Sequence, residues 1–314
     1  MSTRSTGAGE VSRPSGEASA RGKVILLGEH AVVYGQPALA APIDLGLRAR
    51  VTLGAARTTL RSRGHALEAG PAIDGLERVA RSLGAGPVDV EVDGDLPVGG
   101  GLGSSAALGV VVARAIARAQ RVTLSPLEQW RAAMELERAV HGTPSGVDAA
   151  AVAWNLPIRF VRGDGATPQV QPLCGPRSLE LVLALSGKAR ESARLIAGLR
   201  ERRQQDPAAV EHELARLGRL ALSGERAIAG GNLSALGALF DEAHASLAAL
   251  GVSTPELEAV RGAALRAGAL GAKLTGAGGG GAIVALCVDA ADVARELRAQ
   301  GFTCYTRVLE LPLP

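Results

Sequence analysis

A glycine-rich loop at residues 97–107 constrains this chain more than any other segment. Four of the five positions from 99 to 103 are glycine, and two serines follow where a helix-like pattern begins. Glycine lets the backbone approach an anion closely, and a helix start supplies unpaired N–H groups and a positive dipole end. The loop matches neither the Walker pattern nor the dinucleotide fingerprint. It therefore predicts a phosphate site of another kind.

A flexible linker is the alternative interpretation of so many glycines. However, apolar residues recur at helical spacing directly after the loop, with Arg114 and Arg118 on the opposite face. Residues 88–92 alternate like a half-buried strand just before it. The two serines, Ser104 and Ser105, would cap the helix and reach a metal. The order strand, glycine loop, helix favours phosphate binding over a linker.

The composition excludes several classes of protein. Of the 314 residues, 47% are hydrophobic but only 2% are aromatic, so the stacking surfaces of a single-strand nucleic-acid binder are mostly missing. The net charge is +3 and the basic residues are scattered, which argues against a nucleic-acid or membrane partner. The three distant cysteines predict free thiols in a reducing cytoplasm, and the histidines show no zinc-site spacing.

No segment has the apolar length of a membrane helix or the apolar core of a signal peptide. The expected location is therefore cytoplasmic. The number of subunits stays open, with a homodimer as one alternative.

Strands and helices mix without a regular βα repeat, so the fold class expected is α+β with two lobes. Residues 1–20 are rich in Ser, Gly and Ala and predict a disordered tail. The lobes are predicted at 21–175 and 176–314. Expected strands are 23–27, 38–43, 47–53, 88–92, 158–161, 169–173, 181–185, 282–288 and 302–309. Expected helices are about 104–119, 126–141, 147–153, 190–202, 208–229, 232–250, 255–267 and 290–299.

Two carboxylates lie where polar groups are unusual. Glu137 shares a helical stripe with Trp130 and Met134, and a carboxylate on an inward stripe needs a cation or metal partner. Asp148 opens a run of small apolar residues after a Gly/Pro/Ser turn. An edge glutamate and a helix-start aspartate are the ordinary interpretations. Beside a phosphate loop, the pair favours magnesium binding and proton acceptance.

Lysine is rare in this chain. Only three of the 34 basic residues are lysine, at positions 23, 188 and 273, so these are candidates for sites that need a compact point charge. Lys23 lies on the first predicted strand, and Glu29 and His30 lie just past its end. A second glycine-rich turn follows Lys273 at residues 275–281. Two such turns in one chain suggest two backbone walls around one polyanion, although a tight strand connection would have the same composition.

Four segments in order resemble the signature motifs of the GHMP kinase family. Residues 22–35 are similar to the first motif, 97–107 to the second and 273–281 to the third. Residues 137–148 resemble the segment that carries the family's metal-binding and base carboxylates. The resemblance covers nearly the whole chain after the tail. One departure is Arg21, two positions before Lys23, where the family usually has proline.

The resemblance implies a ribosomal-protein-S5-like N-terminal lobe, a ferredoxin-like C-terminal lobe, and an active site between them. It also implies transfer of the γ-phosphate of ATP to the 5-hydroxyl of mevalonate. Asp148 would accept the hydroxyl proton, with Lys23 beside it. Magnesium would be held by Glu137 and by Ser104 or Ser105. The ATP site would comprise Pro97, Gly99, Gly100, Gly101, Leu102, Gly103, Ser104, Ser105 and Ala106. The acceptor site would comprise Glu29, His30, Thr275, Gly276, Ala277 and Gly278.

Two rival functions remain at this stage. A kinase of the same family acting on phosphomevalonate would want extra cations, which Arg190 and Arg194 would supply. A non-catalytic ligand sensor built on the same fold predicts the loss of Lys23, Glu137 or Asp148, yet all three are present.

Overall fold

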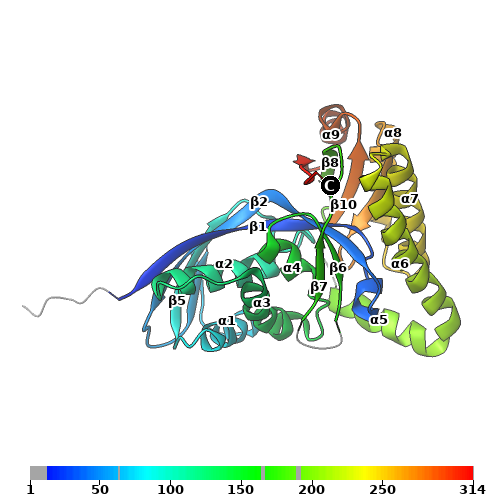
Figure 1. Cartoon of the computed structure of the whole chain (residues 1–314). Helices are drawn as coiled ribbons and strands as arrows, with labels where there is room; N and C mark the ends of the chain where they lie inside the picture. The colour runs from blue at the N-terminus through cyan, green and yellow to red at the C-terminus, as the bar shows by residue number, and fades with distance from the viewer. Residues whose placement is uncertain (1–12, 63, 164–166, 189–191, 314) are drawn as a thin grey trace, which may run out of the picture.

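The computed structural model describes residues 13–62, 64–163, 167–188 and 192–313, and it contains two β-sheets (Figure 1). The first sheet has seven strands in the order β4-β3-β5-β2-β6-β7, with β1 paired to β2. Its pairings are antiparallel except the parallel pair β3 and β5. The bounds are β1 Ser15–Leu27, β2 Ala38–Leu53, β3 Thr59–Ser62, β4 His65–Leu67, β5 Val88–Gly94, β6 Ile158–Val161 and β7 Gln169–Pro172.

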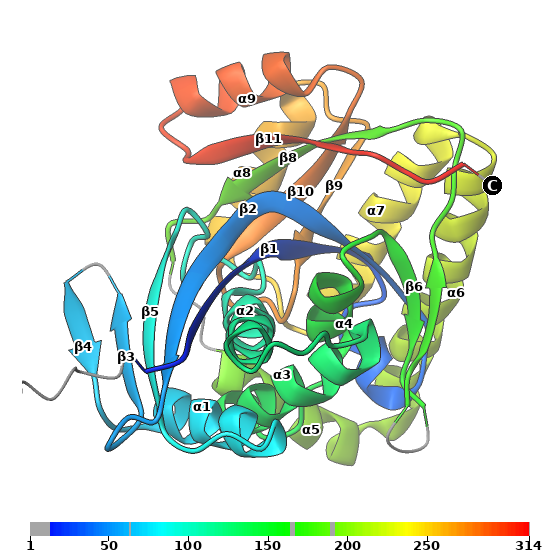
Figure 2. The ribbon, with the colours of Figure 1, turned by 60° about the vertical axis from the view of Figure 1, so that its left-hand side comes forward.

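Four helices pack beneath this sheet, with α2 directly against β1 and β2 (Figure 2). They are α1 Pro71–Ser82, α2 Ser104–Ala119, α3 Pro126–His141 and α4 Val147–Trp154. The start of α3 is set by a capping box, in which the Ser125 hydroxyl accepts from the Glu128 N–H and the Glu128 carboxylate accepts from the Ser125 N–H. The buried residues of α2 are mostly Ala and Val, which allows close packing on the sheet.

The second sheet is antiparallel, in the order β11-β8-β10-β9. Helices α7 and α8 pack on β9, and α9 packs on β8 and β11. The strands are β8 Leu179–Leu185, β9 Gly271–Thr275, β10 Ala282–Cys287 and β11 Cys304–Leu309. The helices are α5 Ser192–Gln205, α6 Pro207–Ala229, α7 Leu233–Ala249, α8 Pro255–Arg266 and α9 Ala290–Ala299. The chain leaves the first sheet at Pro172 and enters the second at Leu179. Within the described residues, no helix is long and apolar enough to cross a membrane.

The two sheets meet at the end of β1. The Thr275 hydroxyl of β9 donates to the Ile25 carbonyl (3.1 Å) and accepts from the Ile25 N–H (3.0 Å). Helix α6 contacts the same end of β1 and the short 3₁₀ helix η1 (Ala31–Tyr34) that follows it. This junction brings together the segments that the sequence singles out.

The predicted disordered tail is wrong from residue 15 onward, because residues 15–20 form the first half of β1. The segment has little apolar surface because α2 packs too close for larger side chains. A Cβ on Gly16 would overlap the Ala115 carbonyl oxygen, and Ala18 and Ala20 are buried. On the other face, Glu17 pairs with Arg50 of β2. Residues 1–12 lie outside the described part.

The other differences concern the extent of elements. The strands predicted at 38–43 and 47–53 are one strand, β2, with a register shift opposite Gly46. Gly46 has no room for a Cβ, which would lie 2.5 Å from the Ala20 carbonyl oxygen. Elements α1, β3, β4 and β9 are absent from the sequence prediction.

Candidate active site

The glycine loop joins β5 to α2 and wraps around the Lys23 side chain. Gly99, Gly101 and Gly103 all have φ between 76° and 82°, a region that favours glycine. Gly103 is the N-cap of α2, so Ser104 and Ser105 occupy the first turn. The expectation that a serine caps this helix is therefore wrong. Both hydroxyls instead lie at the helix start, where the first N–H groups have no partner within the helix.

Lys23 is fully buried and is held at three points. Its backbone N–H donates to the Leu102 carbonyl (2.8 Å), and its ammonium donates to the Gly101 carbonyl (3.0 Å). The ammonium also pairs with Asp148 Oδ2 at 2.9 Å. Because a buried ammonium needs both charge and hydrogen-bond partners, the loop and Asp148 fix its position.

Asp148 lies in the first turn of α4, which begins after Gly146 with φ of 89°. The Trp130 indole N–H of α3 donates to the Gly146 carbonyl (3.0 Å) and so holds this turn in place. While Asp148 Oδ2 pairs with Lys23, Oδ1 is buried and has no hydrogen-bond partner among the described residues. An acceptor oxygen without a hydrogen-bond partner in the described segments thus lies beside a fixed ammonium.

Glu137 of α3 is only 4% exposed and lies close to the same pair. Burial is the largest cause that raises the pKa of Glu137, and repulsion from Asp148 is the second; together they bring it to about 7. The hydrogen bond with Ser105 and the positive charge of Lys23 act in the opposite direction and lower the pKa. Its Oε1 is buried without a partner in the described part of the chain. The Ser105 hydroxyl lies within hydrogen-bond distance of His141 Nε2 (3.1 Å). A carboxylate oxygen without a partner among the described residues, beside the Ser105 hydroxyl, suits a divalent cation that prefers oxygen ligands, so these residues fit magnesium.

Glu29 and His30 follow β1 as predicted, but the two side chains are held differently. Glu29 is buried and pairs with Lys273 of β9. His30 has a φ of 59°, and its Nε2 lies 3.1 Å from the Ala277 carbonyl oxygen. A positive φ in a non-glycine residue costs free energy, and such strain persists where the surroundings fix the conformation. The His30 contact therefore ties the first motif to the second glycine-rich turn.

The second glycine-rich turn contributes only part of its predicted residues to the cleft. Gly276 and Ala277 line it. Thr275 is fully buried, and its hydroxyl is engaged with the Ile25 backbone. Gly278 packs against the Val252 backbone, where a Cβ would overlap the carbonyl oxygen. In this structure Thr275 and Gly278 thus support the turn rather than line the cleft.

Between the two lobes lies a cleft of about 150 Å³ that brings Glu29, His30, Glu137 and Asp148 together. This is smaller than pockets for drug-sized ligands, which are typically about 300–1,000 Å³. Sequence reasoning missed several lining residues, because an aromatic on a 3₁₀ turn and an exposed arginine on a helix carry no local signal. These are Val32, Val33, Tyr34, Thr143, Pro144, Ser145, Leu199 and Arg200.

We expect Gly103→Ala to destabilise the fold by about 1–3 kcal/mol and to lower activity. A Cβ there would lie 2.7 Å from Lys23 Cγ, in addition to the cost of a φ of 82°. Gly84→Ala is the matched control, since Gly84 has a φ of 70° with open space around its Cβ position. Urea unfolding and steady-state rates compare the two. Equal losses in both variants would contradict a packing role for Gly103.

Both lobes match known sequence families. Residues 71–155 match the family described as GHMP kinases N terminal domain, and residues 225–302 match GHMP kinases C terminal. The chain belongs to the GHMP kinase family.

Similar curated proteins point to one branch of that family. The chain is 34% identical to the mevalonate kinase of Methanothermobacter thermautotrophicus, over 88% of this chain and 91% of that protein. It is 33% identical to the mevalonate kinase of Pyrococcus horikoshii, over 93% and 95%. Among solved structures, it resembles L. major mevalonate kinase in complex with R-mevalonate, with a TM-score of 0.83 and 25% identity, covering 96% of this chain and 98% of that one.

Proposed function

We propose that the chain is a mevalonate kinase, which transfers the γ-phosphate of ATP to the 5-hydroxyl of mevalonate. The observation that carries this proposal is the Lys23–Asp148 pair at 2.9 Å, in which the glycine loop holds Lys23 and Asp148 lines the cleft. The names of the similar curated proteins support mevalonate as the acceptor.

The pair suits the chemistry of a hydroxyl acceptor. The acceptor O–H proton passes to the Asp148 carboxylate, which lines the cleft, as the oxygen bonds to the γ-phosphorus and ADP leaves. The Lys23 ammonium offsets negative charge that develops on the acceptor oxygen. Because Lys23 also binds the Gly101 carbonyl, the loop and the base keep a fixed relation to each other.

The start of α2 and the glycine loop supply the ATP side of the site. Backbone N–H groups at a helix start bind phosphate oxygens, and positive φ at Gly99, Gly101 and Gly103 turns the loop around them. Glu137 Oε1 and a serine hydroxyl would hold magnesium. Bound there, the ion would neutralise phosphate charge.

Among the described residues that line the acceptor side, Arg200 is a cation that suits the mevalonate carboxylate. Arg200 of α5 lines the cleft and has no ion pair within the described residues. Three acidic residues, Glu29, Glu137 and Asp148, line the same cleft. A free carboxylate substrate would be repelled by them unless a cation fixed its far end, and guanidinium binds carboxylate through two parallel hydrogen bonds. Arg190 lies outside the described residues, and the Arg194 side chain is likewise undescribed.

The test is phosphorylation of a panel of acceptors by the purified full chain with ATP and magnesium. The panel contains mevalonate, phosphomevalonate, galactose and homoserine, with ADP release measured against a reaction lacking any acceptor. We expect mevalonate to give the highest kcat/KM and a product phosphorylated at the 5-hydroxyl. A higher kcat/KM with another acceptor, or ADP release that does not depend on acceptor, would overturn the proposal.

A further inference from the structure

Lys273 is fully buried on β9, yet the steps proposed above do not use it. Its ammonium donates to Glu29 Oε1 and to the Leu274 carbonyl (2.7 Å), and it lies 5.9 Å from the centroid of the Phe240 ring. A charge taken entirely out of water is costly, so its retention requires strong compensation. A hydrophobic pair of similar volume would often be as stable. Fold stability alone therefore does not explain this lysine.

The partner of Lys273 belongs to the cleft. Glu29 lines it, and while Oε1 is taken by Lys273, Oε2 is buried without a partner in the described ranges. Burial raises the pKa of Glu29 on balance, and Lys273 opposes this rise more than any other group, with a smaller opposing effect from Lys23. Removing the ammonium would thus leave Glu29 protonated at higher pH and free to rotate.

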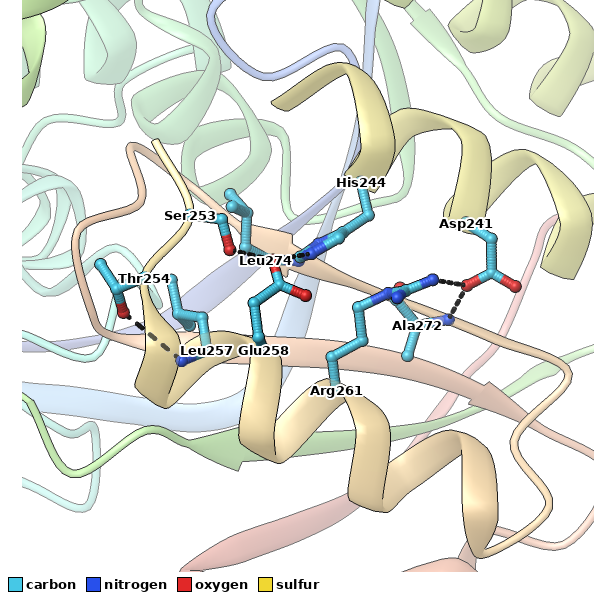
Figure 3. Close-up of polar contacts among 9 residues, drawn as sticks. All are labelled: Asp241, His244, Ser253, Thr254, Leu257, Glu258, Arg261, Ala272 and Leu274. Carbon is cyan, nitrogen blue, oxygen red and sulfur yellow. Dashed lines mark hydrogen bonds and ion pairs between the residues drawn. The ribbon is translucent and has the colours of Figure 1, made fainter. Parts of the chain in front are cut away.

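Strand β9 is itself fixed by side chains of α7 and α8, as Figure 3 shows. Asp241 accepts from the Ala272 N–H (3.1 Å) and from Arg261, whose Nε donates to the Ala272 carbonyl (2.8 Å). His244 Nδ1 accepts from the Leu274 N–H (3.2 Å). Backbone groups on both sides of Lys273 are therefore held in place.

These contacts determine which nitrogen of the His244 ring carries the proton. Since Nδ1 accepts a hydrogen bond, the ring proton is on Nε2, which donates to Glu258 Oε1 (2.8 Å). Burial lowers the pKa of His244, against a raising by Glu258, and so favours the neutral ring that this arrangement requires. The charged groups around the Lys273–Glu29 pair thus include Lys23 on β1 and, beyond Leu274, Glu258 and Arg261, with His244 as a neutral titratable group between them.

We infer that Lys273 is a positioning residue for the acceptor site, which holds Glu29 ionised and oriented so that its free Oε2 can bind an acceptor hydroxyl. The inference rests on the proposed function, because it assigns Glu29 to the acceptor rather than to ATP. The pair links the turn that follows β1 in one lobe to β9 in the other, so it also fixes the two walls of the cleft relative to each other.

Lys273→Met tests the inference, with Lys188→Met as the matched control because Lys188 pairs with Glu256 at the surface. We expect the KM for mevalonate to rise about tenfold or more in Lys273→Met, since a hydrogen bond to a charged group contributes about 1.5–3 kcal/mol. The KM for ATP should stay at the wild-type value. The acid limb of kcat/KM against pH should move to higher pH in Lys273→Met and stay in place in Lys273→Arg, which keeps the charge. Equal changes in both KM values with an unmoved acid limb would show a merely structural role.

Unfolding measurements give a readout that needs no acceptor. In Lys273→Met an unpaired, buried Glu29 has a raised folded-state pKa, so stability should fall as pH rises through that value. The double variant Lys273→Met/Glu29→Gln should lose the part of this pH dependence that Glu29 contributes and keep the part that comes from Glu137. If the wild type prefers another acceptor, the proposed function fails while this comparison still decides whether Lys273 holds Glu29 ionised. The same pH dependence in the single and the double variant would overturn the inference.

Discussion

Asp148→Asn should lower kcat by about 10²–10⁴-fold, the usual contribution of a positioned proton acceptor. The amide oxygen can still accept from Lys23, but the side chain can no longer take a proton from the acceptor hydroxyl. Because Asp148 lies on α4 and the glycine loop precedes α2, the phosphate site keeps its own contacts. ATP affinity should therefore be retained, which calorimetric titration of the folded variant checks.

The control for this substitution is Asp44→Asn. Asp44 is largely exposed and lies 3.8 Å from Arg21, so its pair should contribute little. Its kcat should equal the wild-type value. A variant Asp148→Asn that turns over at a near-normal rate would remove Asp148 from the role of base. A loss of ATP affinity equal to the loss of kcat would instead point to a damaged fold.

The parts of the site that the sequence predicted are those encoded by contiguous residues. Positive φ at Gly99, Gly101 and Gly103 needs glycine wherever the loop lies, so the composition alone indicates a tight loop. The rarity of lysine in the chain is a second pattern that indicates site residues. Lys23 and Lys273 are both fully buried in contact with carboxylates, whereas Lys188 lies at the surface. A compact ammonium suits such sites better than a planar guanidinium.

The parts that escaped prediction depend on contacts between distant segments. The first half of β1 looks unstructured because Gly16, Ala18 and Ala20 must be small where α2 crosses them. Arg200 lines the cleft only because α5 reaches it from the second lobe. The family resemblance predicts Thr275 in the acceptor site, yet its hydroxyl joins the two lobes through the Ile25 backbone. No local pattern distinguishes a residue that lines a cleft from one that supports it.

Glu137→Gln should make the protein more stable at pH 8 and nearly inactive. Activity should fall about 10²-fold or more, because charge neutralisation by a metal contributes several kcal/mol to such reactions. Stability should rise because the buried carboxylate is costly when ionised. A residue that destabilises the fold and is nevertheless present is expected at functional sites.

The sign of the stability change follows from the pKa of Glu137. It is about 7 in the folded protein against an ordinary value of 4.5, so the folded state binds the proton more tightly than the unfolded state. The contribution of Glu137 to wild-type stability is then fully present below pH 4.5 and is lost as pH rises toward 7. Glutamine mimics the protonated form, so the variant should gain up to about 3 kcal/mol at pH 8 and little at pH 5.

Urea unfolding without metal or nucleotide, from pH 5 to 8, measures this difference. Glu135→Gln is the control on the same helix, since Glu135 pairs with Arg138 at the surface and should change stability little at any pH. Magnesium and ATP should raise the stability of the wild type more than that of Glu137→Gln, because ligand binding stabilises only the form that binds. A Glu137→Gln variant with wild-type stability across this pH range would show that burial of the ionised Glu137 carboxylate does not lower the free energy of unfolding. Equal stabilisation of both proteins by magnesium and ATP would exclude Glu137 from holding the ion.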